Sequence, residues 1–425
     1  MIHFTFLLIS LVLSCSFLFA QPTINDFKDH PGLSGGFLAT YPIPDTSKCI
    51  TKESVPKGYV PFYISHYGRH GSRFLDSEWS YNHAIEILQN AKKQACLTDS
   101  GENLLKKLIL AGNAINGRAG DLSSRGVREH KGIARRMYNA YPEVFTSSDD
   151  NPVYIDCRST NVVRCVLSMS AFSESLKELE PKLHITRTSS VRDMSYLAND
   201  KGYQMCKNDT QAVGDSLRST WLKPNRFFSN LISNPDFIKD EIKDPQVEMY
   251  RLFKIAVDLD CTDLQELSMY EFFTPEELWE LWHYVNAYIY VKNGPSEAFG
   301  KYFMSDARPL LENIVNTAQQ VIDGNLSLAA SFRFGHDKNL IPLLYLTGVE
   351  CARSVVSLEE VHNYWNLSEV SPMAANLQFI FFRNKKGNVL VRVLHNEKDA
   401  SLPLPGGPFY SWKILKNYLL NNNTK

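Results

Sequence analysis

Residues 59–73 read YVPFYISHYGRHGSR, a strand-like run that ends in glycine, arginine and histidine. The first six of its residues, 59–64, are aromatic, apolar or β-branched, and the run 59–65 predicts a buried strand. Glycines on either side of Arg69-His70 let the backbone at the strand end approach a small anion closely. Arg69 and Arg73 supply planar guanidinium groups that match phosphate oxygens, and their charge disfavours protonation of the imidazole between them. The stretch therefore predicts a phosphate site in which His70 is a neutral nucleophile.

A second strand end of the same character lies far along the chain, where residues 332–337 read FRFGHD. Phosphoryl transfer needs a group that holds charge on the equatorial oxygens and an acid that protonates the departing alkoxide. His336 and Asp337 fit these two roles. An aspartate beside a bound phosphate dianion is pushed towards its protonated form, as a general acid requires. We therefore expect both residues to lie close to His70.

A third segment, residues 158–165, reads RSTNVVRC and begins a predicted helix. Its two arginines are six residues apart, so both need not face one site. Arg164 is the better candidate for the phosphate pocket, and Arg158 is assigned to packing or loop support.

The remaining pattern predicts an α/β sheet interrupted by helices. Further strands are expected at 152–156, 328–334, 377–382 and 389–394, the last two joined by a hairpin turn at 384–388, and helices at 79–94 and 122–138. Residues 193–303 are charged, aromatic-rich helical segments, which we interpret as a largely helical insert. Ligands of such sheets bind at the carboxyl ends of the strands, where the first two segments lie.

Together these segments resemble the histidine acid phosphatases. The matching motifs are Arg-His-Gly-x-Arg at 69–73, His-Asp at 336–337, an Arg-Ser-Thr-x-x-x-Arg context ending at Arg164, Leu-Ser-Ser-Arg-Gly at 122–126 and Leu-His-Asn-Glu at 394–397. The resemblance implies a phosphoglycerate-mutase-like α/β domain with an inserted α domain, and hydrolysis of a small phosphorylated substrate without a metal or other cofactor. It implies that His70 is the nucleophile, that Asp337 is the proton donor, and that the phosphate ligands are Arg69, Arg73, Arg164 and His336.

Within that family the sequence around residues 63–73 and the late Asn396-Glu397 most resemble the multiple inositol polyphosphate phosphatase and histidine phytase branch. The chain departs from that branch at His336-Asp337-Lys338, where the branch usually reads His-Ala-Glu, and at Leu75, where a proline is common. The resemblance implies inositol polyphosphates such as phytate as substrates. The alternatives are a less selective acid phosphatase acting on sugar phosphates, a phosphoglycerate-mutase-like transferase, and a non-catalytic surface phosphate-binding protein.

The first 20 residues predict a leader. Residues 4–20 form an uncharged apolar run that is typical of a signal-peptide core and short for a membrane span, and no comparable run follows. We expect an exported protein, periplasmic or secreted, cleaved after Ala20, with lipid attachment at Cys15 as the alternative. The expected organisation is a signal peptide at 1–20, the two parts of the phosphatase domain at 21–192 and 304–425, and the helical insert at 193–303.

The charge balance excludes one class of partner. The 45 basic and 46 acidic residues give a net charge of −1, without the basic excess of a nucleic-acid-binding protein. Attraction for an anionic substrate must then be local. Seven cysteines follow the leader, so at least one is unpaired within the chain, and the pairing of the others and the oligomeric state stay open.

Several residues that could carry chemistry are assigned plainer roles. His66 lies four residues before His70 but has no third ligand cluster, so a structural role is favoured over a metal pair. The three histidines expected at surfaces or in hydrogen bonds are His130, His184 and His395. Lys338 is expected at a solvent-facing helix start, with contact to a second phosphate as the alternative, and the aromatic residues of the insert are expected mostly in the core.

Overall fold

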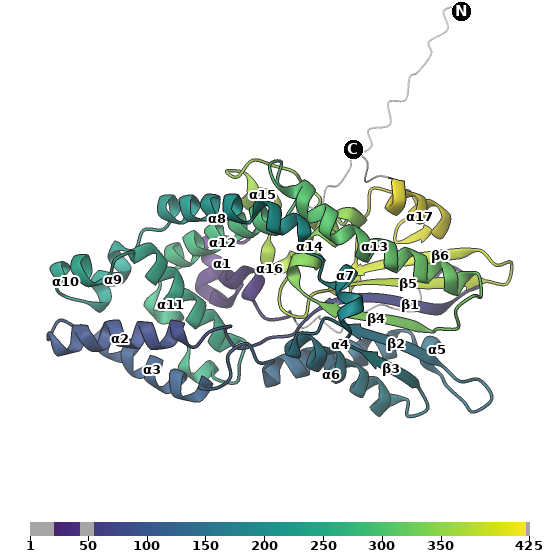
Figure 1. Ribbon diagram of the computed structural model, residues 1–425, viewed down its shortest axis with the longest axis horizontal. Coiled ribbons are helices and arrows are strands. Elements are labelled where there is room, and N and C mark those ends of the chain that lie inside the picture. The colour runs from purple at the N-terminus through teal and green to yellow at the C-terminus, as the bar shows by residue number, and fades with distance from the viewer. Residues whose placement is uncertain (1–20, 43–54, 422–425) are drawn as a thin grey trace, which may run out of the picture.

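The computed structural model describes residues 21–42 and 55–421 (Figure 1). The expected leader, its alternative lipid site Cys15 and one cysteine of the remaining chain, Cys49, lie outside the described residues. Export and the cleavage site therefore stay predictions. None of the helices within the described ranges is both long and apolar enough to cross a bilayer.

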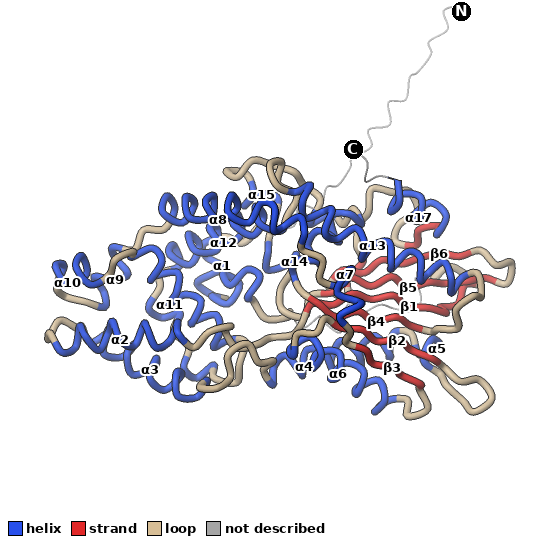
Figure 2. Tube along the Cα trace, in the orientation of Figure 1, coloured by secondary structure: helices blue, strands red, loops and turns tan. Residues whose placement is uncertain are grey.

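An eight-stranded mixed sheet forms one half of the molecule (Figure 2). Its order is β3-β2-β4-β1-β5-β6-β7, with β8 paired to β6; the four strands β3, β2, β4 and β1 are parallel and the rest antiparallel. The strands are β1 Tyr59–Arg69, β2 Tyr154–Ser159, β3 His184–Thr188, β4 Ala330–Gly335, β5 Asn376–Asn384, β6 Val389–His395, β7 Lys398–Asp399 and β8 Phe409–Ser411. The predicted α/β class is confirmed, as are the strands expected from the sequence.

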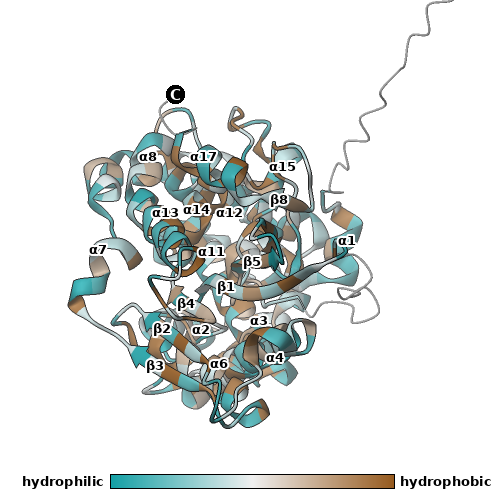
Figure 3. Ribbon diagram, turned by 90° about the vertical axis from the view of Figure 1, so that its right-hand side faces the viewer, coloured by the Kyte–Doolittle hydropathy of each residue, from teal (hydrophilic) through white to brown (hydrophobic). Residues whose placement is uncertain are grey.

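Helices cover both faces of this sheet (Figure 3). On one face lie α4 Ser124–Ala140, α5 Pro142–Phe145 and α6 Val163–Leu179, and on the other α13 Gly300–Ile322, α14 Asp337–Thr347 and α17 Trp412–Asn421. The core beneath α4 and α6 contains Ile133, Phe172 and Phe334, each with no exposed surface. Because both faces are covered, the central strands are buried and mostly apolar, which explains why they could be predicted from the sequence.

The other half of the molecule is helical (Figure 1). It contains α8 Lys201–Trp221, α9 Asn225–Leu231, α10 Pro235–Glu241, α11 Pro245–Asp260 and α12 Pro275–Asn293 from the predicted insert, together with α2 Trp79–Lys93 and α3 Asp99–Ile115 from the first part of the chain. Helix α2 packs against α11, and α3 against α9. The segment between β1 and α4 thus contributes to the helical half. No local pattern in the sequence predicts that α2 and α3 pack against helices of the insert.

Helix α4 is positioned against the end of β1 by its first turn. The Ser123 hydroxyl caps this helix by accepting a hydrogen bond from the Gly126 amide at 3.1 Å. A Cβ on Gly71 would lie 2.7 Å from the Gly126 Cα, so both glycines permit the close approach of these two backbones. The Leu-Ser-Ser-Arg-Gly motif therefore serves to seat the loop that follows His70.

Candidate active site

The two predicted strand ends lie side by side. Strands β1 and β4 are parallel neighbours in a register that places Arg69 opposite Gly335. The His70 amide donates a hydrogen bond to the Gly335 carbonyl at 2.9 Å, and the imidazole centroids of His70 and His336 are 5.6 Å apart. Asp337 follows as the first residue of α14. Residues separated by more than 260 positions are thus brought to one sheet edge.

The third segment joins them through β2, which is the parallel neighbour of β4 on its other side. The Thr160 amide donates to the Phe334 carbonyl at 3.0 Å, so the chain passes the site before α6 begins. Arg164 lies in the first turn of α6 and belongs to the site, whereas Arg158 forms ion pairs with Asp156 and Asp193. Both assignments made from the sequence agree with these positions.

Asp76 is a residue that the sequence analysis missed. Its two carboxylate oxygens lie 2.9 Å from Arg73 Nη2 and 3.6 Å from Arg164 Nη1. One carboxylate thereby holds two guanidinium groups that come from different elements. The available signal was its position three residues after Arg73 in the same loop.

Three guanidinium groups have unused donors at this point. The Nε atoms of Arg69, Arg73 and Arg164 are buried and have no hydrogen-bond partner within the described chain. The Arg69 Nη1 donates to two neutral carbonyls, those of Phe37 and, at 2.8 Å, Ser371, and no carboxylate of residues 21–42 or 55–421 forms an ion pair with this arginine. Buried donors of this kind are uncommon in proteins, and a bound oxyanion would satisfy them.

The tautomer of His70 follows from its neighbour. Nδ1 lies 3.0 Å from the Gly71 carbonyl oxygen, which can only accept, so Nδ1 carries the proton and Nε2 keeps its lone pair. Burial, with the charges of Arg69 and Arg73 and of His336, holds the pKa of His70 well below its usual value. The imidazole is therefore neutral even in acid solution, as the sequence predicts for a nucleophile.

The pKa values of Asp337 and His336 are both lowered by their surroundings. Burial alone would raise the pKa of Asp337, but the nearby charges of Arg69, His336, Lys292 and Arg73 outweigh it and hold this pKa below its usual value. In the free protein the carboxyl is therefore ionised, and a phosphate dianion bound beside it would offset those cations and raise its pKa. Burial lowers the pKa of His336 to about 4, and its Nε2 lies 3.2 Å from the Thr160 hydroxyl.

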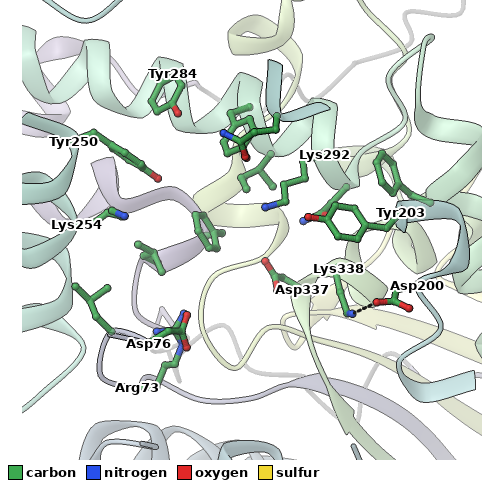
Figure 4. Close-up of a pocket in the computed structure, with 18 of the residues that line it drawn as sticks. Arg73, Asp76, Asp200, Tyr203, Tyr250, Lys254, Tyr284, Lys292, Asp337 and Lys338 are labelled. Atoms are coloured by element: carbon green, nitrogen blue, oxygen red, sulfur yellow. Dashed lines mark hydrogen bonds and ion pairs between the residues drawn. The ribbon is translucent and has the colours of Figure 1, made fainter. Parts of the chain in front are cut away.

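A cavity of about 570 Å³ opens above these groups, between the sheet edge and the helical half (Figure 4). Of the six predicted site residues, Arg73 and Asp337 line its wall; Arg69 and His70 are buried. The cationic side chains that line it are Arg73, Arg218, Lys254, Lys292 and Lys338.

Two of these lysines, Lys254 and Lys292, form no direct ion pair with a carboxylate of the described chain, although Asp76 and Asp337 lie near enough to act on their charges. Lys254 Nζ lies 4.9 Å from the Tyr250 ring, and Lys292 Nζ lies 5.4 Å from that of Tyr288. Burial lowers the pKa of both. By contrast, Lys338 pairs with Asp200 at 3.6 Å. It is the second residue of α14 and its side chain is 36% exposed, as expected for a helix start, and it also lines the cavity.

The other histidines divide between core and surface. His66 packs against Phe172, Phe332 and Phe334 and is structural, as predicted. His130 is buried against Phe334, so a surface position is wrong for it, and the reason is that α4 turns this side of its helix onto the sheet. His395 is buried and hydrogen-bonded to the Val370 carbonyl at 2.9 Å, whereas His184 is exposed. Within the described residues, no three metal-ligating side chains are clustered.

These buried imidazoles predict a steep acid dependence of stability. Burial lowers the pKa of His66 and of His130 from 6.5 to about 3. Between these values the unfolded chain binds a proton at each site that the folded chain does not, so the free energy of unfolding falls as the pH falls. We expect His130→Leu to reduce the slope of that free energy against pH by about 1.4 kcal/mol per pH unit below pH 6. Urea unfolding at a series of pH values measures it; His184→Leu is the control, and an unchanged slope in His130→Leu would show that the imidazole is protonated in the core.

The fold and the site define a class, an α/β protein with a neutral histidine enclosed by arginines at adjacent strand ends. The sequence profile of the histidine phosphatase superfamily (branch 2) matches residues 68–396, and the chain belongs to this family. It is a phosphomonoesterase of the histidine acid phosphatase type, as its motifs indicated. No curated protein sequence matches the chain significantly.

Solved structures share the fold. The multiple inositol polyphosphate phosphatase of Bifidobacterium longum, in complex with inositol hexasulfate, is similar at 20% sequence identity and a TM-score of 0.75, over 92% of this chain and 98% of that one. The phytase from D. castellii is similar at 14% identity and a TM-score of 0.67, over 91% of this chain and 84% of that one. At such identities the likeness establishes the common fold.

Proposed function

We propose that this chain hydrolyses phosphomonoesters of inositol polyphosphates, such as phytate, through a phosphohistidine on His70. The observation that carries the proposal is the set of three unused guanidinium donors around a neutral imidazole, with a carboxyl group beside them. The cations hold the phosphoryl oxygens, and the imidazole and the carboxyl supply the nucleophile and the acid.

Each step has a residue to perform it. His70 Nε2 attacks phosphorus while the bond to the ester oxygen breaks, and Asp337 gives its proton to the departing alcohol. Arg69, Arg73, Arg164 and His336 bind the equatorial oxygens, where charge is concentrated. Water then attacks the phosphoimidazole, Asp337 takes the proton from it, and inorganic phosphate leaves with His70 restored.

The cavity supports a polyanionic substrate. Beyond the group that reacts, it presents Lys254, Lys292 and Arg218 from the helical half, and the two lysines form no direct ion pair in the described chain. Several phosphates on one ring would meet several cations at once. Two structural neighbours with the same fold are by name an inositol polyphosphate phosphatase and a phytase, which supports the same substrate class.

A less selective acid phosphatase is the second candidate, because the distal motif reads His336-Asp337-Lys338 in place of the His-Ala-Glu usual in the inositol polyphosphate branch. Rates on phytate, sugar phosphates and p-nitrophenyl phosphate, measured at acid and neutral pH, separate the two. Tight phosphate binding without release of phosphate from any of them would instead indicate a binding protein.

We expect Lys254→Gln to raise KM for phytate by about tenfold to hundredfold, the value of one charge-assisted contact, and to leave KM for p-nitrophenyl phosphate unchanged. The reason is that Lys254 lies across the cavity from Asp337 (Figure 4), where only a substrate with additional phosphates reaches it. Steady-state kinetics on both substrates measures the effect. Lys301→Gln, at an exposed position in α13, is the matched control. Equal effects of Lys254→Gln on both substrates would contradict a role in selecting polyphosphates.

A further inference from the structure

Residues 369–376, which run from the end of α16 (Leu367–Val370) to the first residue of β5, form hydrogen bonds with His70 and Arg69. The Ala374 amide donates to the His70 carbonyl at 2.9 Å, and the Arg69 amide donates to the Ala375 carbonyl at 2.8 Å. The Ser371 carbonyl accepts from the Arg69 guanidinium. The backbone of Arg69 and His70 and the Arg69 side chain are therefore fixed by one short segment, which we call the support segment, residues 369–376.

The turn after β6 fastens both ends of the support segment through one side chain. Asn396 Oδ1 accepts a hydrogen bond from the Asn376 amide at 2.9 Å, and Asn396 Nδ2 donates to the Glu369 carbonyl at 2.7 Å. The Asn396 amide also donates to the Asn376 carbonyl at 2.9 Å. The side-chain amide thus accepts a hydrogen bond at one end of the segment and donates one at the other. An ionised aspartate can only accept, and a leucine can do neither.

The support segment and the turn after β6 both contain residues with an uncommon backbone conformation. Ala374, Asn396 and Glu397 have φ values of 56°, 48° and 65°, in the left-handed region that non-glycine residues seldom occupy. Such conformations persist where the surrounding contacts hold them, and they concentrate at functional sites. Ala374 is the residue whose amide reaches His70, so the strained position is itself the contact with the nucleophile.

Glu397 anchors the turn to the rest of the protein. Its carboxylate accepts two hydrogen bonds from the Arg136 guanidinium, at 2.9 and 2.8 Å, and one from the Tyr41 hydroxyl at 2.9 Å. A bidentate arginine contact fixes orientation as well as position. Asn396 therefore bonds to the support segment, and Glu397 fixes the position of the turn that carries Asn396.

We propose that Asn396 is a positioning residue for the nucleophile, acting through the support segment on His70 and Arg69. It is buried, with 7% of its surface exposed, and neither it nor Glu397 lines the cavity, so it acts without touching substrate. The proposal rests on the proposed phosphatase mechanism. It assigns a function to the Leu-His-Asn-Glu motif, which the mechanism itself does not use.

The test compares two asparagine variants of the same hairpin. Asn396→Gly removes the side-chain bonds and keeps a residue that accepts positive φ. Asn384→Gly removes a side chain whose oxygen accepts from the Lys386 and Asn388 amides, both at 3.0 Å, at the opposite end of β5. We expect both to lower Tm, and Asn396→Gly alone to lower kcat on p-nitrophenyl phosphate by about tenfold to hundredfold with KM little changed.

Two further measurements keep the outcome decisive. Asn396→Asp retains the acceptor oxygen and regains a donor when protonated, so its kcat is expected to recover towards the wild-type value as the pH falls. If Asn396→Gly does not fold, this recovery is the test. An imidazole NMR signal of His70 that moves in Asn396→Gly and stays in Asn384→Gly reports positioning without turnover.

The results separate the two proposals. A wild-type chain that releases no phosphate from any phosphomonoester refutes the proposed function, and the NMR comparison then decides the positioning role. An active wild type with unchanged kcat in Asn396→Gly, or an equal loss in both glycine variants, overturns the positioning role and leaves the proposed function standing.

Discussion

Replacing His70 with alanine is expected to reduce kcat on phytate and on p-nitrophenyl phosphate by about 10⁴-fold or more, the cost of losing a covalent nucleophile. The arginines remain in this variant, so phosphate is still bound and KM changes little. The loss should be the same for both substrates because both form the same phosphohistidine. Initial-rate kinetics on purified protein measures it.

His184→Ala, at an exposed position stacked on Tyr154, is the control for histidine loss as such. Turnover by His70→Ala within about tenfold of the wild type would show that His70 is not the nucleophile, because removing a nucleophile costs far more. Another group would then have to form the bond to phosphorus, and His336 would be the first to test, because its ring lies 5.6 Å from that of His70.

Asp337→Asn is expected to reduce kcat on phytate by about 10²-fold to 10⁴-fold, the contribution of general acid catalysis, and to affect p-nitrophenyl phosphate less. The inositol alkoxide is a poor leaving group that needs a proton, whereas p-nitrophenolate departs without one. Asp200→Asn is the matched control, because Asp200 lines the same cavity and pairs with Lys338. Because slow hydrolysis of the phosphohistidine would lower kcat on both substrates, the acid role is tested in a single turnover: release of the inositol alcohol by Asp337→Asn as fast as by the wild type would contradict it.

The pH dependence of kcat in the wild type and in Asp337→Asn shows whether Asp337 must be protonated in the complex. The cations around Asp337 hold its pKa below the usual value in the free protein, so bound phosphate must raise it before the carboxyl can act as an acid. The kcat on phytate should therefore fall as the pH rises through the pKa in the complex. Asp337→Asn should lack this limb of the profile, because its amide does not titrate.

The site was readable from the sequence where chemistry and strand ends coincide. His70 and Asp337 stand directly at the ends of apolar strands, and parallel pairing of β1 with β4 then brings them together without any long side-chain reach. Arg164 was readable because it begins a helix after the next strand in the sheet. The catalytic roles of these residues stay predictions until the variants are measured.

What could not be read depends on contacts between distant segments. Lys254 and Lys292 sit on helices whose faces towards the cavity are set by packing in the helical half, to which α2 and α3 contribute from another part of the chain. The support segment has no chemistry-bearing side chain aimed at the site and acts through backbone groups, which carry no sequence signal. Asn396-Glu397 was noticed as a motif, but its function depends on the positive φ and on partners that only the fold reveals.

Mapping the phosphoenzyme identifies the residue that forms the bond to phosphorus. Asp337→Asn protein mixed with p-nitrophenyl phosphate should form the intermediate readily and hydrolyse it slowly, because the group that accepts the proton from water is missing. The mixture is quenched in alkali, where the nitrogen-phosphorus bond survives, digested and analysed by mass spectrometry. We expect phosphate on His70 and a burst of p-nitrophenol equal to the enzyme concentration. Phosphate on any other residue, or continued turnover with no phosphorylated peptide, would contradict this expectation.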